Sequence, residues 1–304
     1  MQVTWVPMTA QVVCTILHFG WLYLLVTYLG MEIKGVALAT FLTYFSQFIF
    51  VEIYGLFVPE VRAAMFFPTK ESFREWGSYL KLSIPSTLML CAEWWAFEVL
   101  ILLAGYIGVV EQAAQILLFN MIALMFMVAL GMQEATCALV GNSVGENNIP
   151  QAKRFFRISF AISSMAIILV IVLVFFTREQ ITRLYTNEEL VVQTTVKTIP
   201  LLCIQFLWDG TQGYLQGVIR GLGLQGKAAI ICLACYYLIA IPLAYVFAFV
   251  CELGNTGLVM GVMCGGFVQA ASYLALVLKS DWQRVADESL KRIENQRALL
   301  DLNE

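Results

Sequence analysis

Residues 85–104 read PSTLMLCAEWWAFEVLILLA, an apolar run that carries two glutamates five positions apart. The run belongs to a longer apolar stretch, residues 79–108, and about 20 apolar residues are enough for one helical crossing of a bilayer. Glu93 and Glu98 are therefore predicted to lie inside the membrane. Because a charge at the bilayer centre costs about 2.5–3.5 kcal/mol even on the most lenient insertion scale, these two carboxylates indicate a functional site.

The same apolar pattern recurs along the whole chain, which has 304 residues, 60% of them hydrophobic and 13% charged. Eight stretches are predicted to cross the membrane: 5–29, 35–58, 79–108, 112–140, 155–176, 191–219, 228–251 and 256–278. The sequence thus predicts an all-α integral membrane protein with eight transmembrane helices. Pro85, Pro200 and Pro242 fall inside spans, where each removes a helical hydrogen bond, and broken helices at membrane depth usually line a cavity.

Positive charge predicts the orientation, because loops on the cytoplasmic side collect lysine and arginine. Fourteen of the eighteen basic residues fall on one side of the predicted spans, five of them after residue 278. Both ends of the chain are therefore predicted to be cytoplasmic. The first apolar run has no basic leader and is longer than a signal-peptide core of about 7–15 residues, so it is predicted to be a retained span.

Several function classes are disfavoured by composition and context. The net charge of −3 and the absence of a basic run with interleaved aromatic residues argue against nucleic acid as a partner. The cysteines lie almost wholly in spans and predict no disulfide framework. GLGLQG, residues 221–226, fits a dinucleotide-binding fingerprint but follows a membrane helix, so it predicts a tight turn. No catalytic or metal-binding motif accompanies the intramembrane acids, and we predict neither an enzyme nor a metal site.

Glycine spacing indicates both close helix packing and an internal repeat. Gly257, Gly261 and Gly265 recur every fourth residue, which places them on one helix face where a neighbouring backbone can approach. Leu29-Gly30 with Gly35 resembles Leu253-Gly254 with Gly257, at an offset of about 222 to 224 residues. This predicts a transporter-like repeat of six spans and, by the same offset, about 150 further residues before Met1 in a complete protein.

The remaining ionisable and polar residues inside spans are candidate binding residues. Glu93 ranks first because it lies nearer mid-membrane than Glu98, and five residues separate the two glutamates by about 140° around a helix. Trp94 and Trp95 offer indole faces, which attract cations. Asp209 lies between Pro200 and two glycines, where a loosened helix exposes it.

Five other polar residues in spans are ranked lower. Asn120, Gln133 and Glu134 are secondary candidates, and Glu134 is either a cavity residue or the hydrogen-bond partner of Gln133. His18 is predicted to be an interhelical hydrogen bonder. Glu52 is predicted to lie at headgroup level and is excluded.

Three blocks resemble the eukaryotic branch of the MATE (multidrug and toxin extrusion) transporters. MLCAEWWAFE, residues 89–98, resembles its seventh-helix signature, and VGNSVG, residues 140–145, resembles the turn after its eighth helix. GVIRGLGLQ, residues 217–225, followed by Tyr236-Tyr237 and Pro242, resembles the passage from its tenth to its eleventh helix. The resemblance covers residues 1 to about 284.

The resemblance implies that the eight spans correspond to helices five to twelve of a twelve-helix, two-lobe transporter. Residues 1–58 would then hold the last two helices of the amino-terminal lobe, 59–78 a cytoplasmic linker between lobes, 79–278 the six-helix carboxy-terminal lobe and 279–304 a cytoplasmic tail. It further implies that Glu93, Glu98 and Asp209 bind substrate and protons. An acidic residue often found in the family's eighth helix is Asn120 here, and Glu134 stands where many members are uncharged. The tail is predicted to form either an amphipathic helix on the membrane face or a solvated end.

Together these features predict a secondary active antiporter that exports organic cations or xenobiotics in exchange for protons by alternating access. It would use no cofactor, with sodium as the alternative coupling ion, and would reside in the plasma membrane or a vacuolar or other organelle membrane. Two alternatives remain: a lipid-linked oligosaccharide flippase of the same superfamily, whose anionic cargo should select a basic cavity, and a truncated, non-transporting membrane scaffold.

Overall fold

The computed structural model describes residues 5–58, 62, 76–288 and 290–291, and it divides into two compact units, Met1–Arg74 and Glu75–Glu304, each described by itself. All described elements are helical, and eight helices have the length and composition of membrane spans. They are Trp5–Tyr28, Glu32–Phe57, Tyr79–Ile107, Val109–Gly145, Ile149–Tyr185, Glu189–Gly221, Gln225–Val250 and Gly254–Lys279. The predicted number and order of spans are thus confirmed.

The first unit is a pair of helices. α1 (Trp5–Leu22) continues as a π-helical turn, η1 (Tyr23–Tyr28), and then returns as α2 (Glu32–Phe57). His18 Nδ1 and Thr43 Oγ1 lie 2.8 Å apart and join the two helices by a hydrogen bond. The prediction that His18 is an interhelical hydrogen bonder is therefore confirmed.

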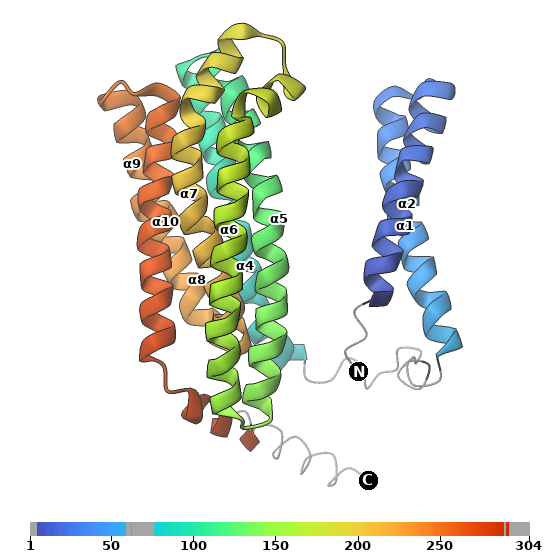
Figure 1. The fold of residues 1–304 in the computed structure, drawn as a ribbon, viewed down its shortest axis with the longest axis vertical. Helices are drawn as coiled ribbons and strands as arrows, with labels where there is room; N and C mark the ends of the chain where they lie inside the picture. Colours follow the sequence, from blue (N-terminus) through green and yellow to red (C-terminus); the bar gives the residue numbers. More distant parts are fainter. Residues whose placement is uncertain (1–4, 59–61, 63–75, 289, 292–304) are drawn as a thin grey trace. The chain divides into compact units, whose positions relative to one another are not determined.

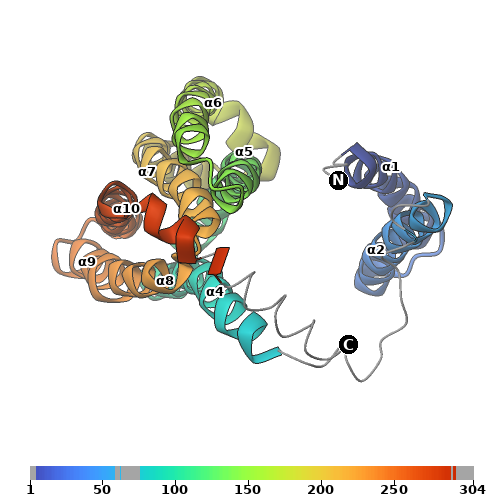
Figure 2. The ribbon, with the colours of Figure 1, turned by 90° about the horizontal axis from the view of Figure 1, so that it is seen from below.

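The second unit is a helical bundle centred on α7, which packs against α5, α6 and α10 (Figures 1 and 2). The seventh span of the chain, Gln225–Val250, is assembled from four short helical segments in succession. The elements are α4 (Trp76–Ile107), α5 (Val109–Gly145), α6 (Ile149–Tyr185), α7 (Glu189–Gly221), α8 (Gln225–Leu233), η3 (Ala234–Ala240), α9 (Ile241–Tyr245), η4 (Val246–Val250) and α10 (Gly254–Lys279). The π-helical segments η3 and η4 were not predicted from the sequence.

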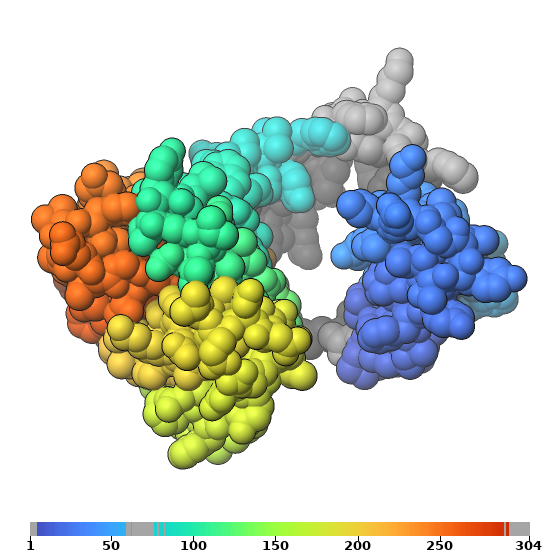
Figure 3. Space-filling view, turned by 90° about the horizontal axis from the view of Figure 1, so that it is seen from above, coloured from blue at the N-terminus to red at the C-terminus, as the bar shows by residue number. Residues whose placement is uncertain are grey.

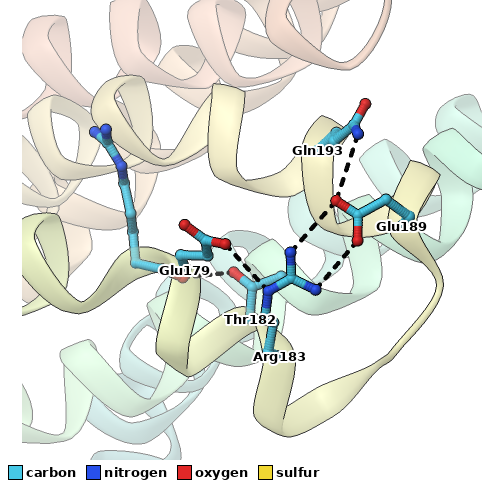
Figure 4. A network of polar contacts seen from close by, with 6 residues as sticks. Glu179, Thr182, Arg183, Glu189 and Gln193 are labelled. Carbon is cyan, nitrogen blue, oxygen red and sulfur yellow. Dashed lines mark hydrogen bonds and ion pairs between the residues drawn. The ribbon is translucent and has the colours of Figure 1, made fainter.

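The turns α4–α5, α6–α7 and η4–α10 gather at one end of this bundle (Figures 1 and 3). There, Arg183 at the end of α6 donates to both carboxylate oxygens of Glu189 at the start of α7, over 3.1 and 3.3 Å, and to Glu179 over 3.1 Å (Figure 4). Gln193 also donates to Glu189. These contacts are exposed, so each contributes little to the stability of the bundle.

The predicted roles of the glycines are confirmed at both places. Gly223 has φ = 68° in the turn between α7 and α8, so the fingerprint-like stretch is a turn. The glycine face of α10 receives the preceding span: methyl groups added at Gly257, Gly261 or Gly265 would overlap atoms of residues 247–248, 244 and 240, respectively.

The two helix pairs that suggested a repeat share one backbone register. Met31 N donates to Leu25 O over 3.0 Å, and Leu253 N donates to Phe247 O over 3.1 Å. Both pairs of positions differ by 222 residues, as do Gly35 and Gly257, each of which closes against the π-helical turn before it. A constant offset of 222 therefore relates the two turns.

The tail folds back across the end of the second unit (Figure 2). Trp282 is 6% exposed, packs edge-on against Phe156 of α6 and donates from Nε1 to Val277 O over 3.1 Å. The described part of the tail is therefore a helical segment held against the bundle through Trp282, and its place at the membrane face stays a prediction; Ile293 lies outside the described residues. Of the predicted linker, residues 59–78, only 62 and 76–78 are described, and residues 76–78 already belong to α4. The assignment of the two units to lobes stays a prediction.

Candidate functional site

Glu93 lies at the centre of a buried polar network. Its side chain is 4% exposed, and its carboxylate accepts three hydrogen bonds. Oε1 accepts from Gln212 Nε2 at 2.5 Å and from Tyr236 Oη at 3.3 Å, and Oε2 accepts from Gln216 Nε2 at 3.2 Å. Three side-chain donors from two other spans therefore meet this one carboxyl group.

The network continues through amide side chains into four further spans. Gln212 Oε1 accepts from Gln216 at 2.5 Å and from Gln269 of α10 at 3.2 Å, while Gln133 of α5 donates to Gln216 at 3.4 Å. Gln269 also donates to Tyr273, whose hydroxyl donates to Ala228 O of α8 at 3.2 Å. Five spans are thus joined through side chains that converge on one carboxylate.

Asp209, one helical turn before Gln212 on α7, shares a cavity with Glu93. The cavity is lined by both acids and by an apolar, mostly aromatic wall: Trp94, Phe97, Phe119, Ile122, Ala123 and Phe126. Trp94 meets Phe119 edge-on at 5.8 Å, and Phe97 lies 5.7 Å from the same ring. The site therefore combines two carboxyl groups with ring faces, which attract cations.

Asp209 is less well satisfied than Glu93. Its side chain is 2% exposed, yet Oδ1 has no hydrogen-bond partner among the described residues, and neither does Nε2 of Gln205 one turn away. A buried oxygen without a donor is unfavourable, because removing it from water is not compensated. Asp209 is thus the carboxyl of the pair with an unpartnered oxygen, and its binding role stays a prediction.

The structure brings some of the predicted site residues together and leaves others apart. Glu93, Trp94 and Asp209 line one cavity, whereas Glu98 and Trp95 project from α4 outside it; Trp95 is 59% exposed. Glu93 and Glu98 are separated by about 140° around the helix axis, which accounts for their different surroundings. The functional roles of Glu98 and Trp95 stay predictions.

The secondary candidates take different places. Gln133 is buried in the network, and Asn120 is exposed and donates to Ile116 O of its own helix at 2.9 Å. Glu134 is half exposed and pairs with Arg220 of α7 at 2.5 Å. The interpretation of Glu134 as the partner of Gln133 is therefore wrong, because Gln133 bonds to Gln216 instead.

Sequence reasoning missed four polar residues around Glu93: Gln212, Gln216, Tyr236 and Gln269. A signal for two of them was present, since Gln205, Asp209, Gln212 and Gln216 follow the spacing of one helix face.

Within the described residues, no group of three or more His, Cys, Asp or Glu side chains could hold a metal ion.

Replacing Gln212 by leucine is expected to lower the stability of the protein by about 1–3 kcal/mol, because Glu93, Gln216 and Gln269 each lose a partner in a buried site. Thermal unfolding in detergent, followed by tryptophan fluorescence, would measure the loss. Gln115→Leu is the matched control: Gln115 is equally buried, but its Oε1 has no partner among the described residues. Equal losses for the two variants would mean that the network adds nothing.

These features define a multi-pass helical membrane protein with a buried acidic and aromatic cavity. Residues 85–246 match the MatE family, and the chain belongs to that family. It is 30% identical over 267 residues to multidrug and toxin extrusion protein 1 of Mus musculus, covering 88% of this chain and 47% of that protein. It is 29% identical over 301 residues to multidrug and toxin extrusion protein 2 of Homo sapiens, covering 98% and 50%. The chain thus spans about half the length of these relatives.

A solved structure shows the same fold. The crystal structure of the eukaryotic MATE transporter AtDTX14 is similar with a TM-score of 0.90 and 27% identity, over 94% of this chain and 64% of that one. That share is close to the two thirds expected if the eight spans are helices five to twelve of twelve. The predicted family and fold class are confirmed.

Proposed function

We propose that this protein works as a secondary active antiporter that exports organic cations or other xenobiotics in exchange for protons. Its relatives are named multidrug and toxin extrusion proteins, and AtDTX14 is described as a transporter. The proposal includes small amphiphilic molecules as substrates and no enzymatic activity. It also keeps the plasma membrane or a vacuolar or other organelle membrane as the location, with both ends cytoplasmic.

The observation that carries the proposal is the pair of buried carboxyl groups in one aromatic cavity. Two like charges in a space of low dielectric repel each other strongly, so the pair favours a state with a bound proton or a bound cation. A cation that enters beside Trp94 would balance the negative charge of the pair in place of the bound proton, and the proton would leave. Exchange then follows from competition for the same negative charge.

The cavity as it stands is small. The space left for water between its side chains is about 20 Å³, enough for a single water molecule. A drug-sized guest needs about 300 Å³ or more, so the side chains that line the cavity must move apart for a guest to enter. The proposed transport cycle therefore includes a rearrangement of the aromatic wall.

Protons are the better supported coupling ion. Asp209 Oδ1 is a buried carboxyl oxygen without a hydrogen-bond partner among the described residues, and binding a proton would turn this group into a donor. The oligosaccharide flippase alternative expects a basic cavity, but the residues that line this one include two acids and no lysine or arginine. We therefore retain the antiporter.

The test is to measure cation binding and proton release together. The purified chain in a weakly buffered detergent solution would be titrated with a fluorescent organic cation while a pH indicator records released protons. We expect about one proton per bound cation near neutral pH, by linkage of the two equilibria, and no release with a neutral analogue of similar shape. Binding without proton release would contradict proton coupling, and no binding of either compound would favour the scaffold alternative.

A further inference from the structure

A second hollow, of about 290 Å³, lies where the tail folds back onto the bundle. It is formed by the start of α6, the end of α10 and the first residues after α10. Lys153 and Arg157 stand one turn apart on α6, and Ser280 and Trp282 come from the segment after α10. This hollow is distinct from the central cavity, because the two share no lining residue.

The charge of this hollow is uncompensated. Lys153 and Arg157 are both exposed, neither forms an ion pair within the part of the chain that the structure describes, and the lining residues include no acid. Arg157 uses Nε for the carbonyl of Lys153 at 3.4 Å, which leaves its two terminal nitrogens for a ligand. A guanidinium with both terminal nitrogens available matches a phosphate group bidentately.

An adjacent hollow provides a contrast. It is lined by three basic residues, Lys227, Lys279 and Arg284, and by two acids, Asp281 and Glu288. Arg284 Nε is already paired with Glu288 Oε1 at 2.9 Å. Its charge is therefore largely balanced by its own acids, whereas the charge of Lys153 and Arg157 is not balanced by any residue that lines their hollow.

The other wall of the hollow at Lys153 and Arg157 is apolar. Phe156, Val277 and Leu278 line it, and Leu278 is 67% exposed on the outside of the bundle, where acyl chains surround a membrane protein. Lys153 lies in the first turns of a span and Lys279 ends another, so the hollow sits at the level of the lipid headgroups. Its ligand must therefore combine an anionic head with an apolar body.

We propose that this hollow binds the headgroup of an anionic phospholipid, with the phosphate between Lys153 and Arg157 and the acyl chains along Leu278. Trp282 of the tail also lines the hollow, so the bound lipid stabilises the docked tail. A soluble phosphate compound would satisfy the charges but not the apolar wall. The predicted surplus of basic residues on this side agrees with the cytoplasmic leaflet, which is rich in anionic lipid.

The test uses the full chain in detergent, titrated with dioctanoyl phosphatidylserine and followed by native mass spectrometry. We expect K153Q/R157Q to weaken binding about tenfold or more relative to the parent, because two charge-assisted contacts are lost. R157K keeps the positive charge but replaces the two terminal nitrogens of the guanidinium by one ammonium group, so an intermediate loss of affinity is expected. The matched control is R154Q/K291Q, which removes the same net charge from exposed residues that line neither hollow and should change binding less than about twofold.

Two further arms identify the ligand. Dioctanoyl phosphatidylcholine, which has no net charge, should bind about tenfold more weakly than the serine lipid. Sodium phosphate should displace the serine lipid only weakly; if phosphate alone binds as tightly, the site recognises free phosphate and the lipid proposal is overturned. Equal binding of the serine lipid by K153Q/R157Q and R154Q/K291Q, with unchanged unfolding temperatures, would also overturn it.

Discussion

Replacement of Glu93 by glutamine is expected to weaken binding of an organic cation roughly 30-fold or more and to reduce the proton release that accompanies it. The weakening follows from loss of one partner of a buried charge pair, which typically costs about 2–5 kcal/mol. Glutamine keeps the size of the side chain but places an amide donor opposite the donors of Gln212, Gln216 and Tyr236. Fluorescence titration with a pH indicator would measure both effects in one sample.

Two other glutamates serve as controls for this variant. Glu52 is half-buried on α2 and was excluded as a site residue, so Glu52→Gln should leave binding and proton release unchanged. Glu98 is exposed outside the cavity, and Glu98→Gln should have a smaller effect than Glu93→Gln. If Glu98→Gln alone abolished proton release, the cavity between Glu93 and Asp209 would not be the coupling site.

The number of spans was predictable because the bilayer sets their length and the apolar residues reveal it. Their ends were not equally predictable. The fifth span runs from Ile149 to Tyr185, whereas the apolar pattern covered only residues 155–176. The helix continues in both directions through charged turns, because Asn148 caps its start by accepting from the backbone of Gln151 and Arg183 is held at its end. Such local contacts decide helix ends, and hydropathy does not record them.

The central network shows a different limit. Attention to formal charge selected Glu93 and Asp209 but passed over the neutral amides on the same face of α7. The spacing of Gln205, Gln212 and Gln216 was a readable signal. Gln269 and Tyr236 were not predictable in the same way, because their approach to Glu93 depends on how α10 and the π-helical segment η3 are rotated against α4.

The internal repeat was recognised with an offset of about 222 to 224 residues, and the backbone hydrogen bonds fix the offset at 222. Matching Gly30 to Gly254 gives an offset of 224, whereas the backbone hydrogen bonds give 222. Both turns contain two left-handed residues, Gly30 and Glu32 in the first and Glu252 and Gly254 in the second, with φ between 46° and 63°. Glycine relieves the strain at only one position of each turn, and at a different one in each. Backbone conformation is therefore repeated where residue identity is not.

The strongest effect on folding is expected at Gly261. A methyl group at this position would overlap the backbone nitrogen and Cα of Ala244, and neither can move without displacing the whole preceding span. Gly261→Ala should therefore destabilise the protein by about 1–3 kcal/mol, and Gly261→Val should prevent a folded monomer from forming. Size-exclusion chromatography in detergent and thermal unfolding would report the two outcomes.

Gly131 offers the matched control, since it lies inside α5 with nothing within 4 Å of an added methyl group. Gly131→Ala should be neutral or stabilising by up to about 1 kcal/mol, because alanine favours the helix more than glycine does. Replacing glycine by alanine is thus expected to change stability in opposite directions at the two positions. The direction depends on which atoms face each glycine. If Gly261→Ala also left the unfolding temperature unchanged, the seventh and eighth spans could not pack as closely as the glycine face of α10 requires.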